Sequence, residues 1–152
     1  MIEFRHVSFS YDFRGEQEDI RKKDSLHDIN LKVNDGECVL LCGKSGCGKT
    51  TITRLVNGLV PNFYTGKLTG EVLLDGRNIS EMPIYEVASH VGSVFQNPRT
   101  QFFNMDTDSE IAFGMENLAL PRKQIEEKVA STAKDLEIEN LLKRNIFSLS
   151  GG

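Results

Sequence analysis

The stretch GKSGCGKT at residues 43–50 decides how the rest of the chain is interpreted. It fits the pattern G-x-x-x-x-G-K-[ST], which is typical of a phosphate-binding loop between a buried strand and a helix. Glycines let successive backbone N–H groups turn toward phosphate oxygens, and the helix that follows directs its positive end at the same anion. The pattern predicts a site for a phosphorylated ligand. The alternative is a glycine-rich turn that binds nothing.

Three side chains at the end of this stretch have the chemistry that a nucleoside triphosphate requires. Lys49 is placed to reach the β- and γ-phosphates, and the hydroxyl of Thr50 is placed to ligate Mg²⁺. Thr51 can add a hydroxyl to the α-phosphate. The residues predicted to contact the ligand are Gly43, Lys44, Ser45, Gly46, Cys47, Gly48, Lys49, Thr50 and Thr51.

The residues on either side of the loop fit a strand–loop–helix unit. ECVLLC at residues 37–42 is a continuous apolar run, as in a strand that is covered on both faces. Cys38 and Cys42 would then point to one face, and we interpret all three cysteines of the chain as buried or loop thiols without a redox role. After the loop, apolar residues recur at helical spacing, at Ile52, Leu55, Val56 and Leu59, with Gly58 and Pro61 marking the helix end.

Strands are expected to dominate the first part of the chain. Apolar alternation predicts strands at 2–9 and 27–33, and another strand is expected at 90–95. Two further short strands are expected around a turn at Asp75-Gly76. Asp75 also follows an apolar run, as a metal ligand can, but the turn is the favoured interpretation.

Helices are expected to dominate the second part. The run TDSE at 107–110 indicates a capping box before a short helix at 110–117. A longer helix is expected after Pro121, with an apolar stripe at Ile125, Val129, Ala133 and Leu136. We therefore expect a strand and phosphate-loop part at 1–96 and a helical part at 97–152.

Composition limits the possible functions. The 152 residues are the size of one domain, and 18 Lys plus Arg against 22 Asp plus Glu give a net charge of -4. This balance argues against a dedicated nucleic-acid binder, which usually shows a basic face. No signal peptide or spanning helix is evident, so a cytoplasmic protein is expected. The three histidines, His6, His27 and His90, are interpreted as structural or surface residues.

Three further stretches point to one family. VFQNP at 94–98 resembles the Q-loop of ATP-binding cassette ATPases, and LSGG at 149–152 resembles the start of their signature motif. VSFSY at 7–11 resembles the strand that ends in their adenine-stacking aromatic. The order and spacing of these motifs match across the chain. FQNPRTQFF, EIAFGMEN and LVPNFYTGKLTGEVLLDG further resemble the energy-coupling factor branch, which powers vitamin and metal-ion uptake, and some members of which carry two cassettes in one polypeptide.

The resemblance implies an α/β fold of the P-loop NTPase class. It comprises a RecA-like core with an N-terminal antiparallel β subdomain, followed by the start of a helical subdomain. ATP and Mg²⁺ are the implied cofactors. Tyr11 would stack on adenine, with Phe9 or Phe13 as alternatives, and Gln96 would touch Mg²⁺ and the attacking water.

The resemblance also implies partners. Ser150, Gly151 and Gly152 would bind the γ-phosphate held by a second ATPase protomer or domain. Phe102 and Phe103 fall where the family receives a transmembrane subunit's coupling helix, and a core role for them is an equal alternative. Such a protein would lie at the inner face of the cell membrane. The transported substrate is not encoded in these motifs.

The family's later catalytic residues have no counterpart in the 152 residues. The acidic pair that follows the signature and the switch histidine are expected beyond Gly152, so the chain resembles the front two-thirds of a cassette domain. We therefore expect binding of MgATP without hydrolysis. Alternatives are a P-loop kinase of small molecules, a cassette ATPase of DNA repair or chromosome organisation, and a binding-only module. The kinase would need an acceptor-side Arg cluster, and the chromosome ATPase a coiled coil and a basic face.

Overall fold

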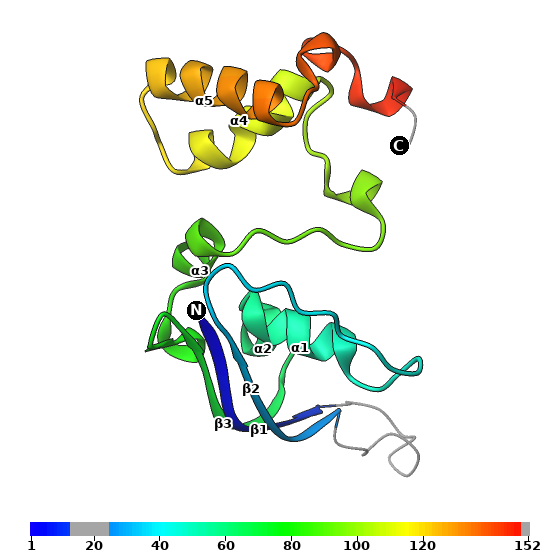
Figure 1. Cartoon of the computed structure of the whole chain (residues 1–152), viewed down its shortest axis with the longest axis vertical. Helices are drawn as coiled ribbons and strands as arrows, with labels where there is room; N and C mark the ends of the chain where they lie inside the picture. Colours follow the sequence, from blue (N-terminus) through cyan, green and yellow to red (C-terminus); the bar gives the residue numbers. More distant parts are fainter. Residues whose placement is uncertain (13–24, 150–152) are drawn as a thin grey trace. The chain divides into compact units, whose positions relative to one another are not determined.

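A computed structural model describes residues 1–12 and 25–149 of the chain. These residues form two compact units, Met1–Ser93 and Val94–Gly152, which are described separately (Figure 1). The first unit contains the predicted strands and phosphate loop, and the second is helical.

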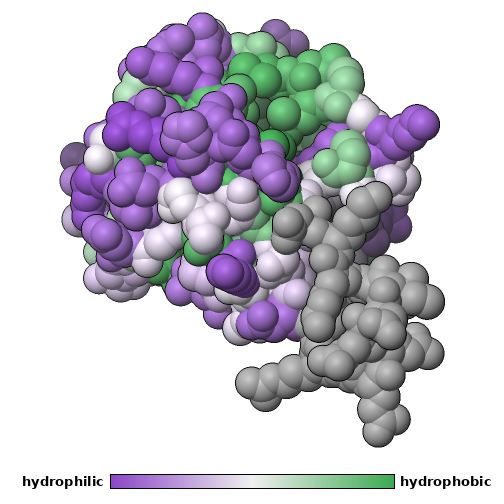
Figure 2. All heavy atoms as spheres, turned by 90° about the horizontal axis from the view of Figure 1, so that it is seen from below, coloured by the Kyte–Doolittle hydropathy of each residue, from purple (hydrophilic) through white to green (hydrophobic). Residues whose placement is uncertain are grey.

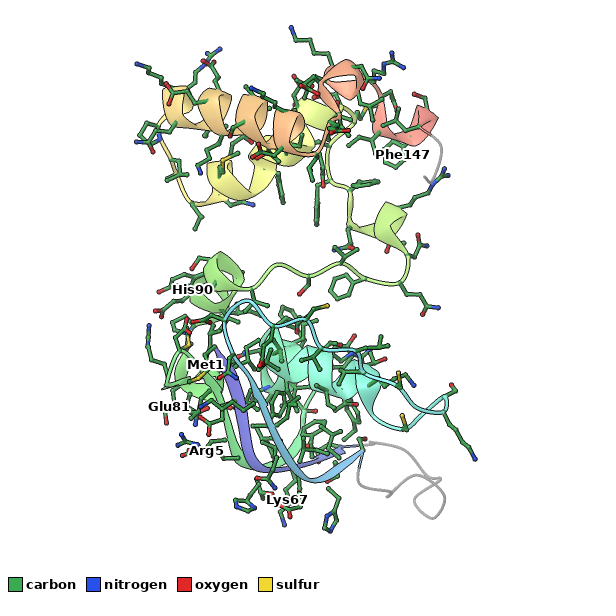
Figure 3. The ribbon with its side chains drawn as sticks, viewed as in Figure 1. Met1, Arg5, Lys67, Glu81, His90 and Phe147 are labelled. Carbon is green, nitrogen blue, oxygen red and sulfur yellow. The ribbon has the colours of Figure 1, made fainter. Side chains whose placement is uncertain are left out.

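The first unit is built on an antiparallel sheet with the strand order β2-β1-β3-β4. Each of the three neighbouring strand pairs is antiparallel. The amine of Met1 lies 2.6 Å from carboxylate oxygens of both Asp35 and Asp75, just before β1 begins (Figure 3). The strands confirm three sequence predictions, with bounds β1 (Ile2–Tyr11), β2 (Leu26–Val33), β3 (Gly66–Leu74) and β4 (Arg77–Asn78).

A bulge in β1 keeps the apolar residues of this strand on the covered face. Phe4 pairs with Leu31 of β2, and the next pair is Val7 with Ile29, so β1 contains one extra residue between them. Because alternate residues of a strand face opposite sides, the extra residue returns Val7 to the side of Phe4. Both are buried, as is Phe9.

Helices cover one side of this sheet and complete its core (Figure 1). The helix after the phosphate loop forms as predicted and ends before Gly58, but Leu59, the last residue of its predicted stripe, and Pro61 belong to a separate short helix. Leu55 of that helix and Val60 are fully buried against the strand residues. The elements are α1 (Lys49–Val56), α2 (Leu59–Asn62), the 3₁₀ turn η1 (Ile79–Glu81) and α3 (Ile84–His90).

Two predicted strands are wrong. Residues 37–42 have no regular secondary structure, and Leu40 within them is 84% exposed. Residues 91–95 likewise follow α3 without forming a strand, and Val94 is exposed. Strands require a neighbour for their backbone hydrogen bonds. Within the described residues, the four strands pair only with one another, so neither segment has such a neighbour.

The second unit is centred on two packed helices, α4 (Thr107–Asn117) and α5 (Arg122–Asp135). Ala112 of α4 and Ala133 of α5 are buried. The predicted helix after Pro121 is confirmed, although Leu136, at the end of its expected stripe, is exposed. Short 3₁₀ turns lie at η2 (Pro98–Gln101), η3 (Glu139–Leu141) and η4 (Ile146–Ser148), and Figure 3 marks Phe147 in the last of these.

The start of α4 differs from the predicted capping box. Asp106 is the cap, because its Oδ1 accepts a hydrogen bond from the backbone N–H of Ser109 at 3.0 Å. The pKa of Asp106 is lowered chiefly by hydrogen bonds from Ser109. Glu110 instead accepts hydrogen bonds from the backbone N–H groups of Phe103 and Asn104. Among the described residues, no helix has the length and apolar character needed to cross a membrane.

Candidate functional site

The phosphate loop is held against the start of β2 by a close contact at Gly48. This residue has a φ of +96° and directly precedes α1. A side-chain carbon at Gly48 would lie 2.5 Å from the carbonyl oxygen of Ser25 and 2.7 Å from a methyl group of Leu26. Glycine is therefore required here for two reasons, the left-handed backbone and the close approach of a neighbouring strand.

The first turn of α1 is open to an anion. No side chain caps the helix at Gly48, and its first turn contains no acidic residue. The first N–H groups of a helix have no partner within the helix and carry its positive end. The loop and the helix start therefore offer backbone donors and positive potential at one place, as the sequence predicts.

Lys49 extends over this loop. Its ammonium donates hydrogen bonds to the carbonyl oxygens of Gly43 and Lys44, each at 2.8 Å, and lies 3.5 Å from the sulfur of Cys47. These contacts hold the positive charge beside the backbone groups that would surround a phosphate. The arrangement fits the predicted role of Lys49 toward the β- and γ-phosphates.

The two threonines that follow Lys49 have different surroundings. Thr50 is exposed at the helix start, where a hydroxyl is an oxygen ligand of the kind that Mg²⁺ prefers. Thr51 is 5% exposed, and its hydroxyl lies 3.2 Å from the hydroxyl of Tyr11. Thr50 therefore fits the predicted metal role, and Thr51 is linked to the residue predicted to contact the base.

Tyr11 is surrounded by aromatic rings. The rings of Phe9 and Tyr64 meet it edge to face, with centroids 4.7 Å and 6.3 Å away. Phe9 is 1% exposed, so this residue has no free face for adenine and that alternative is wrong. Phe13, the other alternative, lies outside the described residues. Stacking of Tyr11 on a base stays a prediction.

The remaining predicted site residues belong to the second unit. Gln96 is exposed in the segment before η2, and its contact with Mg²⁺ stays a prediction. Ser150, Gly151 and Gly152 lie outside the described residues. Phe103 is 78% exposed and stacks on Phe113 at 5.0 Å, which contradicts a core role for Phe103, whereas Phe102 is partly buried.

The cysteines and Asp75 agree with their structural interpretations. Cys38, Cys42 and Cys47 are free and exposed, as loop thiols rather than buried ones. Asp75 lies in the turn between β3 and β4, and its contact with the amine of Met1 lowers its pKa. No group of metal-binding side chains is found among the residues that the structure describes.

The three histidines lie at exposed positions of the first unit. His6 lies 2.8 Å from Asp28 across the bulge, and this contact lowers the pKa of Asp28. His6 and His27 belong to strands of the sheet, and His90 ends α3. All three are exposed, in agreement with structural or surface roles.

Sequence reasoning missed two residues beside the site. Arg54 donates a hydrogen bond to the hydroxyl of Tyr11 at 3.1 Å, and its guanidinium carbon lies 3.9 Å from the ring centroid of Tyr64. A basic residue in the last turn of α1 is visible in the sequence, but its partners are 43 and ten residues away. Only the folded chain brings these three side chains together.

Comparison with known proteins gives the family. A family model described as ABC transporter matches residues 26–152. The chain belongs to the ABC transporter family. Its phosphate loop, Q-loop stretch and LSGG sequence lie within the matched region, so the resemblance based on these motifs is confirmed.

Two relatives illustrate how the chain compares with other ABC proteins. A putative ABC transporter ATP-binding protein of Treponema denticola is 52% identical over 152 residues, which are all of this chain and 30% of that protein. The putative HMP/thiamine import ATP-binding protein YkoD of Bacillus subtilis is 37% identical over 153 aligned positions, 100% of this chain and 27% of that protein. The chain thus spans about a third or less of these relatives.

Solved ABC structures have the same fold. The cbiO1 protein from Clostridium perfringens, part of the ABC transporter complex cbiONQ, superposes with a TM-score of 0.78 at 24% identity, over 98% of this chain and 55% of that one. The dimeric cassette MJ0796 bound to ADP and Pi superposes with a TM-score of 0.74 at 22% identity, over 99% and 64%. The α/β P-loop fold expected from the sequence is thereby confirmed.

Proposed function

We propose that this chain is the nucleotide-binding part of an ABC transport ATPase and that it binds MgATP at the loop of residues 43–51. The observation that carries the proposal is the ammonium of Lys49, which is held over the loop at the uncapped start of α1. A phosphate chain at this position would meet backbone N–H groups, the helix dipole and one positive charge.

Thr50 is the residue that we assign to Mg²⁺. Its hydroxyl is exposed beside Lys49, and hard oxygen ligands suit this ion. The metal would neutralise charge on the β- and γ-phosphates, which Lys49 would also contact. Gln96 is assigned to the same ion and to the attacking water on the basis of the family motif alone.

The parent protein is proposed to be an importer of the energy-coupling factor type. Its relative YkoD is named for HMP/thiamine import, and cbiO1 is described as part of the complex cbiONQ. By analogy, a second ATPase would contribute its phosphate loop opposite Ser150–Gly152. A transmembrane subunit would dock at the inner face of the membrane, and the exposed Phe103 is our candidate contact for it.

Residues 1–152 are expected to bind nucleotide with little turnover. Hydrolysis requires a positioned water and preorganised stabilisation of the γ-phosphoryl group, and losing one such group commonly slows catalysis by about 10²–10³. The acidic residue and the histidine that serve this purpose in the family have no counterpart in this sequence. A small-molecule kinase would instead transfer phosphate without a partner protomer.

Calorimetric titration with MgATP tests the binding site. Lys49→Ala should weaken binding by roughly tenfold or more, because a hydrogen bond to a charged group contributes about 1.5–3 kcal/mol. Lys67→Ala is the charge-matched control, since Lys67 is exposed on β3 and should leave affinity unchanged. Equal affinity for the wild type and Lys49→Ala would remove Lys49 from this role.

Phosphate release tests the expected lack of turnover. The purified chain is incubated with MgATP, alone and with small-molecule acceptors, and inorganic phosphate and phosphorylated products are measured. The expected result is release near background in every sample. Turnover near one per second that Lys49→Ala abolishes would show a complete enzyme, and acceptor-dependent transfer would favour the kinase.

A further inference from the structure

Four side chains from three segments of the first unit meet beside the phosphate loop. They are Tyr11 at the end of β1, Thr51 and Arg54 in α1, and Tyr64 shortly after α2. The hydroxyl of Tyr11 lies 3.2 Å from that of Thr51 and accepts a hydrogen bond from Arg54 at 3.1 Å. We call these four residues the tyrosine–arginine cluster.

One hydrogen bond of the cluster has a fixed direction, and the other can be donated by either hydroxyl. A guanidinium has only donors, so the oxygen of Tyr11 is the acceptor toward Arg54. The phenol proton of Tyr11 can then be donated to the oxygen of Thr51. When Tyr11 is the donor, the proton of the Thr51 hydroxyl is available for a hydrogen bond to a phosphate. Thr51 belongs to the first turn of α1, where the proposed phosphate site lies.

Arg54 is well placed to fix this arrangement. Its guanidinium lies over the ring of Tyr64 at 3.9 Å, a cation–π contact that restrains a long side chain. Tyr64 in turn meets Tyr11 edge to face, and Phe9 meets Tyr11 from its own strand. The ring of Tyr11 is thus held by two aromatic neighbours while its hydroxyl is held by Arg54 and Thr51.

We propose that Arg54 is a positioning residue for the phosphate site. Through the hydroxyl of Tyr11 it orients the hydroxyl of Thr51, so that a bound phosphate chain and the environment of Tyr11 are coupled. The inference rests on the proposed function, because it takes the loop of residues 43–51 as the site for phosphate. According to this proposal, the Tyr11 hydroxyl contributes to phosphate binding whether or not the Tyr11 ring contacts a base.

Tyrosine fluorescence is a direct readout of this coupling. The chain has three tyrosines and no tryptophan, so tyrosine emission is observed without interference. Magnesium tripolyphosphate is the probe, since it carries a phosphate chain, has no base and does not absorb where tyrosine is excited. The expected result is a change in emission on binding that is lost in Tyr11→Phe and in Arg54→Met.

Tyr85→Phe is the matched control. Tyr85 is 71% exposed in α3 and lies outside the cluster, so this variant should lower total emission and keep the response to the probe. A response that depends on Tyr85 and persists in Tyr11→Phe would overturn the proposal. So would calorimetric binding of the probe to the wild type without any change in emission.

The affinity of the same probe gives a second test by a double-mutant cycle. Tyr11→Phe and Arg54→Met should each weaken binding by roughly fivefold, as expected for one hydrogen bond. The double variant should be no weaker than either single variant, because both remove the same link. Losses that multiply to roughly 25-fold would overturn the proposal, since they would mean independent effects.

Arg54→Lys separates geometry from charge. It keeps the positive charge but not the planar guanidinium, so the proposal expects weaker binding than in the wild type. Wild-type affinity in Arg54→Lys would mean that only charge matters and would overturn the positioning role. Circular dichroism checks that each variant is folded. If Arg54→Met does not fold, Tyr11→Phe and Arg54→Lys are used for the test instead. If the wild type binds neither the probe nor MgATP, the proposed function itself fails; if it binds MgATP but not the probe, the coupling proposed here is overturned.

Discussion

The strand β1 and the segment 37–42 are both rich in apolar residues, yet only β1 forms a paired strand in the structure. β1 is paired on both sides, by β2 and β3, and buries Phe4, Val7 and Phe9. Residues 37–42 form no strand and expose Leu40. The difference is one of neighbours rather than composition, because an unpaired strand leaves its backbone groups without partners.

The largest expected effect on the free energy of unfolding is tested with two leucines, one in the core that contains β1 and one in the segment 37–42. Leu55 in α1 is 1% exposed and belongs to the same buried core as the apolar residues of β1, whereas Leu40 lies in the unpaired segment. Leu55→Ala should lower the free energy of unfolding by about 2–5 kcal/mol, because it leaves a cavity in the core. Leu40→Ala should change it by less than about 0.5 kcal/mol. Urea unfolding followed by circular dichroism measures both, and similar losses would contradict the comparison.

A smaller effect is expected where β3 passes the bulge of β1. Gly70 has a φ of +79°, and a side-chain carbon there would lie 2.3 Å from the carbonyl oxygen of His6. Gly70→Ala should therefore cost more than the roughly 1–2 kcal/mol of left-handed backbone strain alone. Gly76→Ala is the control, since Gly76 has a φ of +81° but no neighbour within 4 Å. Equal unfolding free energies for the two variants would show that β3 and β1 separate easily at this point.

The second unit should respond to acid through Asp106. The hydrogen bonds from Ser109 that cap α4 lower the pKa of this carboxyl below its usual range. Its contribution to stability is therefore complete above the usual value of about 3.9 and is lost as the pH falls through the folded-state pKa. Helical circular dichroism should show part of α4 melting in that window.

Asp106→Asn supplies the control for that measurement. Asparagine caps helices about as well as aspartate but does not titrate. The variant should keep its α4 helicity at low pH and lose the acid-dependent component. Identical acid profiles for the wild type and the variant would assign the transition to other carboxyl groups.

The smallest effect on stability is expected from adding charge to the unpaired segment. Exposed apolar segments favour association with other chains, and residues 37–42 expose both Val39 and Leu40. Leu40→Lys should leave unfolding within about 0.5 kcal/mol of the wild type. Light scattering should show less self-association in this variant, and a monodisperse wild type would contradict the expectation. Figure 2 shows, on one face of the molecule, hydrophobic residues at the surface among hydrophilic ones.

Local patterns in the sequence predicted the elements that depend on local contacts. The hairpin at Asp75-Gly76, the helix after the phosphate loop and the helix after Pro121 all form where expected. Each depends on turn residues or on a helical stripe within one segment. The phosphate loop itself was predicted in the same way, because its pattern is contiguous.

Contacts between distant residues could not be predicted from the sequence. The apolar run at 37–42 indicates a buried strand, but whether it pairs depends on strands elsewhere. The cap of α4 lies one residue before the predicted one. Asp106 and Thr107 are both acceptable caps, and in the structure the hydroxyl of Thr107 donates to the carbonyl oxygen of Leu141 instead. The link from Arg54 to Tyr11 spans 43 residues and leaves no periodic pattern.

The two hydrogen bonds from Lys49 to the carbonyl oxygens of Gly43 and Lys44 have a consequence for the entropy of ligand binding. A free lysine loses side-chain conformational entropy, up to about 2 kcal/mol, when a partner immobilises it. Here the chain has already restricted the ammonium before any phosphate arrives. A phosphate that enters the loop would bind an ammonium that is already ordered. Its association should therefore cost less conformational entropy than at a site where the lysine is mobile before binding.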